Sequence, residues 1–321
     1  MTANSPILGP SQDDRPIVIA ALFILVILIA GTAYTWVHFG SAPLLSPSYL
    51  LQQLQIGSFL GIVAAGMMLV ILISQIDLSV PWTLAAAAMM ATAVDGPLAI
   101  PVGLGVGLAV GIVNGLGVAY LRVPSMIFTL GVNAVMRGLM VAYTGGFAPQ
   151  TTASELMRFL AGERTLGIPN ALFVWAAVSL FVVVILQRTP LGRYIYAIGN
   201  KEAAAYLSGV NTRRVTVICF ALCGLTAALA GVLLAGYSTK AYQAMGDAYL
   251  LPAIAAVVIG GTNILGGRGR YVGTLVGVVL IVLLNSVLSI MDMPEAGRQV
   301  IYGAVIIFML LVYGRSERVT S

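Results

Sequence analysis

Long apolar segments, separated by short polar ones, make up most of the sequence. A helix needs about 20 apolar residues to span a bilayer, and runs close to that length recur along the chain. The pattern predicts an all-α polytopic membrane protein of about ten transmembrane helices, which we place at residues 17–37, 54–74, 82–94, 98–121, 124–143, 171–187, 216–236, 251–262, 272–290 and 300–313. The segment 251–262 is short for a span and contains Pro252 and the pair Gly260–Gly261. It therefore either crosses the membrane as a broken helix or re-enters.

Composition and charge narrow the class of protein. Of the 321 residues, 60% are hydrophobic and only 8% are charged, whereas about 25% charged residues is usual in soluble domains. The net charge of +5 comes from basic residues in short loops beside apolar runs. That is the arrangement that orients membrane proteins, so we expect contact with lipid and no binding of nucleic acid.

The distribution of lysine and arginine predicts the orientation. With both termini in the cytoplasm, eleven basic residues fall inside: Arg15, Arg122, Arg188, Arg193, Lys201, Arg213, Arg214, Arg268, Arg270, Arg315 and Arg318. Four fall outside: Arg158, Arg164, Lys240 and Arg298. This bias supports a cytoplasmic tail at 1–16, a transmembrane domain at 17–313 and a second cytoplasmic tail at 314–321.

The longest polar interruption with a strong basic bias is the loop 188–215. Within it, Asn200 can cap a short helix, Glu202 lies in its first turn, and Gly209 marks its end. The expected helix of about nine residues would be roughly 13 Å long. Its apolar positions at helical spacing are Ala203, Tyr206, Leu207 and Val210. The helix is either a solvated loop element beside lipid headgroups or a docking element in a groove of a partner protein.

Several polar side chains lie inside predicted spans. Asn114 is either a clasp between helices or a lining residue of a polar path. Thr129, Asn133 and Arg137 recur every four residues, and Arg137 is either tied to backbone carbonyls or faces a path. Asn285 lies inside the ninth predicted span. Small residues make up another pattern: Gly103, Gly107, Gly111 and Gly115 form a ridge for close helix packing, and Cys219 and Cys223 are expected in the core.

The chain lacks the side chains that would supply energy or catalysis. No GxxxxGK[ST] motif occurs, and the apolar runs hold no carboxylate apart from Asp77 at an edge, where Asp77 and Ser79 can cap the next helix. We find no nucleophile and base at membrane depth and no metal-ligand set. We therefore predict no catalytic residue, no metal site and no cofactor on this chain, with energy arriving from another subunit.

Four stretches together resemble one family. They read QIDLSVPWTLA at residues 75–85, GIVNGLGVAYLRVPSMIFTLG at 111–131, AIGNKEAAAYLSGVNTRRV at 197–215 and AIAAVVIGGTNILGGRGRYVGTLVG at 253–277. In this order they are similar to the ribose-type permease family of ATP-binding cassette importers, over almost the whole chain from Gln52 to Arg315. Three positions depart from the family: Pro81 stands where a glycine is usual, and Leu250 and Pro252 stand where many relatives carry acidic residues.

The resemblance implies a role for the short helix. The short helix would couple the chain to an ATPase subunit, through Gly199, Asn200, Lys201, Glu202, Ala203, Ala204, Ala205, Tyr206, Leu207, Ser208 and Gly209. For the translocation path the resemblance names no residues, and we take as hypothetical lining residues the polar ones inside the predicted spans: Asn114, Thr129, Asn133, Arg137 and Asn285. The implied partners are the ATPase, which would bind ATP and Mg, a second permease subunit, identical or different, and a periplasmic sugar-binding protein.

The resemblance also implies a location and a substrate class. The chain would be the multi-pass translocator of a monosaccharide or similar polyol importer in the bacterial inner membrane, with the glycine-rich turn at 266–270 on the ATPase side. One alternative is an ATP-driven permease for branched-chain amino acids or another small polar solute. The alternative from another class is a channel or secondary carrier that works alone.

Overall fold

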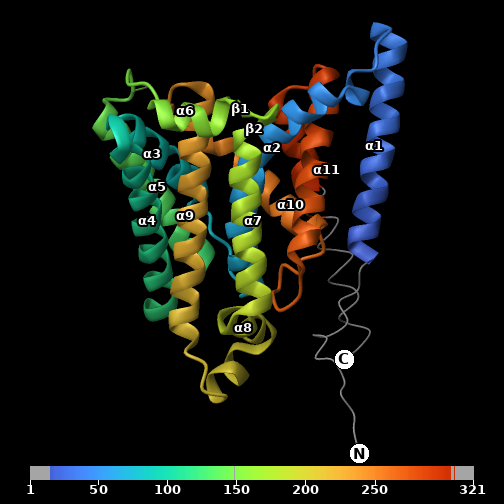
Figure 1. Cartoon of the computed structure of the whole chain (residues 1–321). Coiled ribbons are helices and arrows are strands. Elements are labelled where there is room, and N and C mark those ends of the chain that lie inside the picture. The colour runs from blue at the N-terminus through green and yellow to red at the C-terminus, as the bar shows by residue number, and fades with distance from the viewer. Residues whose placement is uncertain (1–14, 148, 305–306, 308–321) are drawn as a thin grey trace, which may run out of the picture.

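The computed structural model describes residues 15–147, 149–304 and 307. Long helices run roughly parallel to one another between two ends of the molecule (Figure 1). The helices are α1 (Arg15–Phe39), α2 (Pro47–Leu72), α3 (Val80–Thr92), α4 (Ala99–Leu121), α5 (Ser125–Thr144), α6 (Glu155–Gly162), α7 (Asn170–Arg188), α8 (Pro190–Leu207), α9 (Thr212–Ser238), α10 (Leu250–Ile259) and α11 (Tyr271–Ile290). Three 3₁₀ turns join them: η1 (Pro43–Leu45), η2 (Gly96–Leu98) and η3 (Gln243–Tyr249).

The described residues confirm an all-α polytopic protein but not the count of ten spans. Within the described part of the chain, seven helices are long and apolar enough to cross a membrane: α1, α2, α4 with the preceding turn η2, α5, α7, α9 and α11. The predicted spans 82–94 and 251–262 are the short helices α3 and α10. α3 carries Pro81 near its start, and α10 carries Pro252 in its first turn. Residues 1–14 of the predicted N-terminal tail, the predicted tail 314–321 and most of the tenth span lie outside the described residues, whereas residues 15 and 16 already belong to α1.

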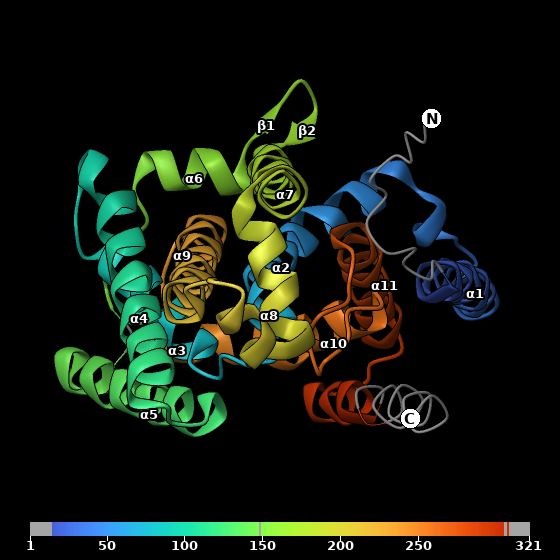
Figure 2. The same cartoon turned by 90° about the horizontal axis from the view of Figure 1, so that it is seen from below.

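Helix α2 forms the centre of the bundle. Most of it is buried, from Gly57 to Leu72, among α7, α9, α10 and α11. Helix α1 packs on the outer side of α11, and α5 lies at the edge beside α3 and α4, as the view from the α8 end shows (Figure 2). The sequence of α2 alternates bulky side chains with Gly57, Gly61 and Gly66, and Gly61 receives the indole of Trp175 from α7. Small residues thus let neighbouring helices approach the central one closely.

The predicted glycine ridge is confirmed as a packing surface. Gly107 and Gly111 of α4 contact the backbone of α9 so closely that a Cβ atom at either position would overlap it. Gly224 of α9 meets Gly107 and Gly111 in return. The predicted core cysteines are confirmed as well, because Cys219 and Cys223 are free thiols buried in α9.

The two ends of the bundle differ in structure. At one end, α6 lies across the helix termini with the short antiparallel hairpin β1 (Arg164–Thr165) and β2 (Ile168–Pro169), in which Thr165 pairs with Ile168. Gln55 of α2 donates a hydrogen bond to the carbonyl of Ala161 there. At the other end, α8 projects below the long helices (Figure 1).

Candidate coupling helix and membrane-depth polar site

Helix α8 has two arms that meet at a kink. Thr189 caps the first arm, since its hydroxyl accepts a hydrogen bond from the Gly192 N–H at 3.4 Å, and Pro190 occupies the first turn. Lys201 is non-helical, with φ −161° and ψ 100°, and the second arm continues to Leu207. The predicted helix at 200–208 is therefore the second arm of a longer, kinked element. The first arm extends from a threonine–proline start signal that the sequence reading did not use.

Asn200 does not act as the predicted helix cap. Its side-chain amide donates to the Tyr196 carbonyl at 3.0 Å and to the Gly267 carbonyl at 3.5 Å. The extended residue before the second arm, which is the conformation of an N-cap, is Lys201. Asn200 therefore fastens the end of the first arm to a neighbouring loop.

The second arm ends where the sequence predicts. Gly209 has φ +84°, and its N–H donates to the Tyr206 carbonyl at 3.0 Å. The Val210 N–H donates to the Ala205 carbonyl at 3.1 Å, which completes a Schellman motif. This closed end fixes the direction in which the tip of the arm points.

The tip of the second arm presents apolar side chains to solvent. Tyr206 is 68% exposed and Leu207 is 85% exposed, whereas Ala205 is buried and Val210 is partly buried. The predicted apolar face is thus divided, because Val210 packs against the body and Tyr206 and Leu207 point away from it. Two large exposed side chains on a short, fixed helix form a surface suited to a protein partner.

A second polar site lies between α2 and α3, where the chain leaves helical geometry. Residues 75–79 form no regular helix, and unwound backbone at membrane depth needs hydrogen-bond partners. Helix α5 supplies them at four-residue intervals. The hydroxyls of Ser125 and Thr129 accept from the N–H groups of Ile76 (3.3 Å) and Leu78 (2.9 Å), and the Asn133 carbonyl oxygen accepts from the Trp82 N–H (3.3 Å).

The predicted polar stripe therefore holds the backbone of the unwound segment. Ser125 is a member that the sequence reading missed, although it lies one four-residue step before Thr129. Thr129 is fully buried and Asn133 is partly exposed.

Arg137 continues the same stripe towards the opposite end of α5. Its guanidinium lies 5.9 Å from the ring centroid of Trp82 and is exposed. Its charge acts on the carboxylate of Asp247 in η3, which is also exposed. Asp247 is a second residue that sequence reading missed, because its proximity to α5 depends on how η3 packs against the start of α3.

Asn114 of α4 belongs to a separate buried cluster at the unwound segment. Its amide donates to the Ser79 hydroxyl at 2.7 Å and to the two carboxylate oxygens of Asp77 at 3.3 and 3.4 Å. Asp77 also accepts from the Ser79 N–H at 2.9 Å. Asn114 and Asp77 are fully buried. These contacts favour the clasp over the path-lining interpretation of Asn114, and Asp77 shapes the turn instead of capping α3, which has no side-chain cap.

Asn285 is not near the other candidate path residues. Its carbonyl oxygen accepts from the guanidinium of Arg298 at 2.8 Å, and Arg298 forms an ion pair with Glu295 at 3.2 Å. The structure thus gathers Asn114, Thr129, Asn133 and Arg137 around residues 75–82 and leaves Asn285 in a separate contact on α11.

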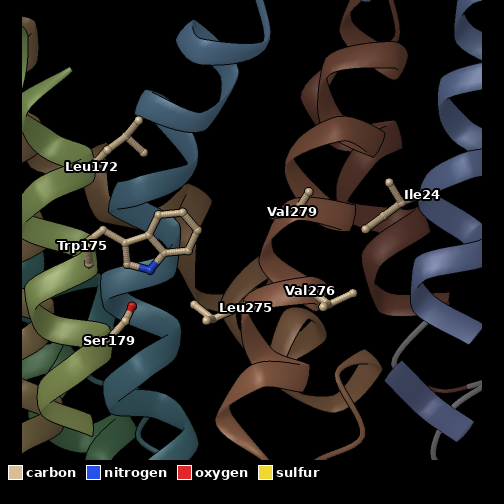
Figure 3. Close-up of a pocket in the computed structure, with 8 residues that line it drawn as sticks. Ile24, Leu172, Trp175, Ser179, Leu275, Val276 and Val279 are labelled. Atoms are coloured by element: carbon tan, nitrogen blue, oxygen red, sulfur yellow. The ribbon is translucent and has the colours of Figure 1, made fainter. Parts of the chain in front are cut away.

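An open groove of about 510 Å³ lies elsewhere, between α1, α7 and α11. In Figure 3, Leu275 of α11 lies towards Trp175 and Ser179 of α7, while Val276 and Val279 of α11 lie on the side nearer Ile24 of α1. The lining is almost wholly apolar. It therefore suits lipid and lacks the polar groups that a hydrophilic solute would need.

Seven helices of membrane-spanning length in the described residues, together with short buried helices that carry a proline in the first turn and an unwound segment held by polar side chains, indicate a multi-pass membrane protein and are typical of transporters. The family described as branched-chain amino acid transport system, permease component, matches residues 49–310, and the chain belongs to this family.

Three relatives illustrate the match. The ribose import permease protein of Escherichia coli K12 is 38% identical over 286 residues, which cover 85% of this chain and 89% of the relative. The ribose import permease protein of Bacillus subtilis 168 is 40% identical over 303 residues, covering 91% and 90%. The autoinducer 2 import system permease protein of Shigella flexneri is 31% identical over 309 residues, covering 95% and 88%. No solved structure matches this chain.

Proposed function

We propose that this chain is the permease subunit of an ATP-binding cassette importer for a monosaccharide or similar small polyol, in the bacterial inner membrane. The names and coverage of the ribose and autoinducer 2 import permeases support this substrate class. The chain itself would catalyse no reaction, because ATP and Mg would be bound and ATP hydrolysed on a partner ATPase. A periplasmic binding protein would deliver the sugar to the end that carries α6.

The observation that carries the proposal is the exposed tip of α8. Leu207 and Tyr206 project from the end of the bundle on an arm whose direction is fixed at Gly209. We assign this end to the cytoplasm, where the ATPase works, because the basic residues of 188–215 and 266–270 gather there. The arm from Lys201 to Ser208 would seat in a cleft of the ATPase, and closure of that partner on ATP would move it.

Substitution of Ala204 tests this coupling role. Ala204 is exposed in the second arm, so Ala204→Asp leaves the chain's own packing intact and places an unpaired carboxylate in the proposed interface. We expect sugar uptake by the reconstituted complex to fall by about tenfold or more, since such a charge costs at least about 1.4 kcal/mol. The measurement is ATP-driven uptake into proteoliposomes together with co-purification of the ATPase.

A matched control uses the opposite end of the molecule. Leu166 is 94% exposed in the hairpin turn, and Leu166→Asp should leave co-purification of the ATPase unchanged. Unchanged uptake and co-purification in Ala204→Asp would refute the coupling role. Uptake by the purified chain alone, without an ATPase, would instead support the stand-alone carrier.

The polar edge of α5 supports a translocation path on that side of the chain. Arg137 lies about 18 Å from Ser125 and about 10 Å from Thr144 along the helix, so it is well inside the span. Exposed charges at this depth, on Arg137 and Asp247, are costly in lipid. We propose that this edge faces a second permease subunit across a water-filled path, with Asn133 and Arg137 as lining residues.

Neutral replacements of the two charges test the path. Arg137→Gln and Asp247→Asn should each raise the sugar concentration for half-maximal uptake by about tenfold, the loss expected for one hydrogen bond to a charged group. Basal ATP hydrolysis should stay unchanged, because Arg137 lies about 18 Å along α5 from Ser125, the residue at the end of α5 nearer to α8. Wild-type uptake kinetics in both variants would exclude a lining role.

A second candidate substrate follows from the family description. Branched-chain amino acids are named there, and nothing in the polar edge of α5 rejects a small zwitterion. A ligand screen of the cognate binding protein, by thermal shift with pentoses, hexoses and branched-chain amino acids, separates the two. Stabilisation by leucine, isoleucine or valine alone would replace the sugar assignment.

A further inference from the structure

The loop from Asn263 to Arg270, at the same end of the bundle as α8, is tightly folded. The Asn263 N–H donates to the Arg268 carbonyl at 2.9 Å, and the Leu265 N–H donates to the Asn263 side chain at 3.0 Å. Gly266 and Gly267 have φ values of +87° and +74°, which favour glycine. The loop therefore has a defined shape and holds its tip in a fixed position.

This loop is fastened to both α8 and the end of α2. The Tyr196 hydroxyl and the Asn200 amide of α8 donate to the carbonyls of Gly269 (2.8 Å) and Gly267 (3.5 Å). The Gly267 N–H donates to the Leu72 carbonyl at 3.0 Å. Gly199 packs against the same two backbones, and a Cβ atom there would overlap the Leu72 carbonyl.

Ser74 adds further hydrogen bonds between the loop and α8, and we call this set of contacts the junction. Its hydroxyl donates to the carbonyls of Leu265 and Gly199, and its φ of +62° marks the point where the chain turns out of α2. The next residues are the unwound segment that α5 holds at Ile76 and Leu78. The junction therefore connects the kink of α8 to the membrane-depth polar site over a few residues.

The tip of the loop is exposed beyond the junction. Leu265 is 59% exposed, and the Arg268 side chain is also exposed. Since Asn200 joins the loop to the kink of α8, the exposed tip of this loop and the coupling helix lie at the same end of the molecule, on neighbouring segments. A fixed apolar tip beside a basic side chain, at an end of the molecule assigned to the cytoplasm, suits a protein surface.

We propose that the loop Asn263–Arg270 is a second contact surface for the ATPase, centred on Leu265. This inference rests on the proposed function, because it requires the ATPase at this end. Pressure on Leu265 would act on Ser74 and the end of α2 through the backbone contacts of the junction. The partner would then move the unwound segment from two points, the tip of α8 and this loop.

Site-specific photo-crosslinking tests the contact. A photoreactive amino acid is placed singly at Leu265, at Leu207 and at Leu166, in the full chain assembled with its ATPase in membranes. We expect crosslinks to the ATPase from positions 265 and 207 and none from position 166. The products are identified by their mass and by antibody detection of the ATPase.

The outcomes separate this inference from the proposed function. A crosslink from 207 without one from 265 would overturn the second contact and keep the coupling helix. A crosslink from 265 to lipid only would assign the loop to the headgroup layer and also overturn it. Crosslinks from neither position would refute the proposed function itself.

A substitution at the tip gives an independent measurement. Leu265→Asp should weaken association of the ATPase by about tenfold, as expected for loss of a central apolar anchor, while Leu166→Asp leaves it unchanged. Because Leu265 is exposed, the variant should keep the wild-type elution profile in detergent. Wild-type affinity for the ATPase in Leu265→Asp would contradict the proposal.

Discussion

Helices α1 and α5 are equally exposed, yet they carry different side chains. In the most apolar window of each helix only 11% of the residues are buried. The central residues of α1 are apolar from Ile17 to Ala30, whereas α5 carries Thr129, Asn133 and Arg137 along one side. Figure 2 shows the two helices at edges of the bundle that are far apart.

The comparison shows that a helix surface exposed in a single membrane-protein chain is covered either by lipid or by protein and water. For α1, an exposed surface without polar groups is the surface that lipid covers. For α5, the same exposure with a charge well inside the helix is compatible only with protein or water on that side. We therefore propose that the edge bearing α5, η3 and the start of α3, which we call the functional edge, faces protein or water.

The largest expected effect is a charge on the lipid-facing helix. Val26 is 58% exposed near the middle of α1, and Val26→Arg should cost about 2.5–3.5 kcal/mol of insertion free energy. We expect most of the detergent-extracted protein to be lost or aggregated, as measured by fluorescence-detected size-exclusion chromatography.

The matched change on the functional edge removes a charge. Arg137→Leu should retain the wild-type elution profile, because the side chain is exposed and its loss leaves no buried backbone group unpaired. A normal profile for Val26→Arg, or an aggregated one for Arg137→Leu, would reverse the assignment of the two surfaces.

A smaller effect is expected from a buried hydroxyl on α5. Thr129→Val keeps the shape of the side chain but leaves the Leu78 N–H without its acceptor, which should lower the free energy of unfolding by about 1–3 kcal/mol. Thermal unfolding in detergent, followed by tryptophan fluorescence, measures the loss.

The smallest effect is expected from the same change on α1. The Thr32 hydroxyl is buried and finds no hydrogen-bond partner in the described part of the chain. Thr32→Val should therefore leave the unfolding temperature unchanged or raise it slightly. Equal losses in the two valine variants would show that the α5 hydroxyl does not support the unwound segment.

The sequence predicts the helices well where their apolar runs are continuous. The expected spans 98–121 and 171–187 agree with α4 and α7 to within one residue at each end, because a run of lipid-compatible side chains ends where polar residues begin. The glycine ridge and the end of the coupling helix at Gly209 were also predictable, because each follows from one residue type at a fixed spacing.

Contacts between distant segments could not be predicted in the same way. Asn200 reads as a cap from its neighbours, but its amide reaches Gly267, which no local rule places beside it. Asp247 comes within reach of the charge of Arg137 only because η3 folds back onto α3. The roles of Thr129 and Asn133 depend on the N–H groups of Leu78 and Trp82, which need acceptors and which no local rule places beside α5.

The mutual glycine contact of α4 and α9 limits how the subunit can change shape. Gly107, Gly111 and Gly224 bring the two backbones into direct contact, so rotation of either helix would bring side chains into collision with the other backbone. The two helices should therefore move as one rigid unit when the subunit changes shape. Movement is then left to the parts hinged around it: α5, which follows α4 through a turn with Arg122 at φ +55°, and the broken segment that α5 holds.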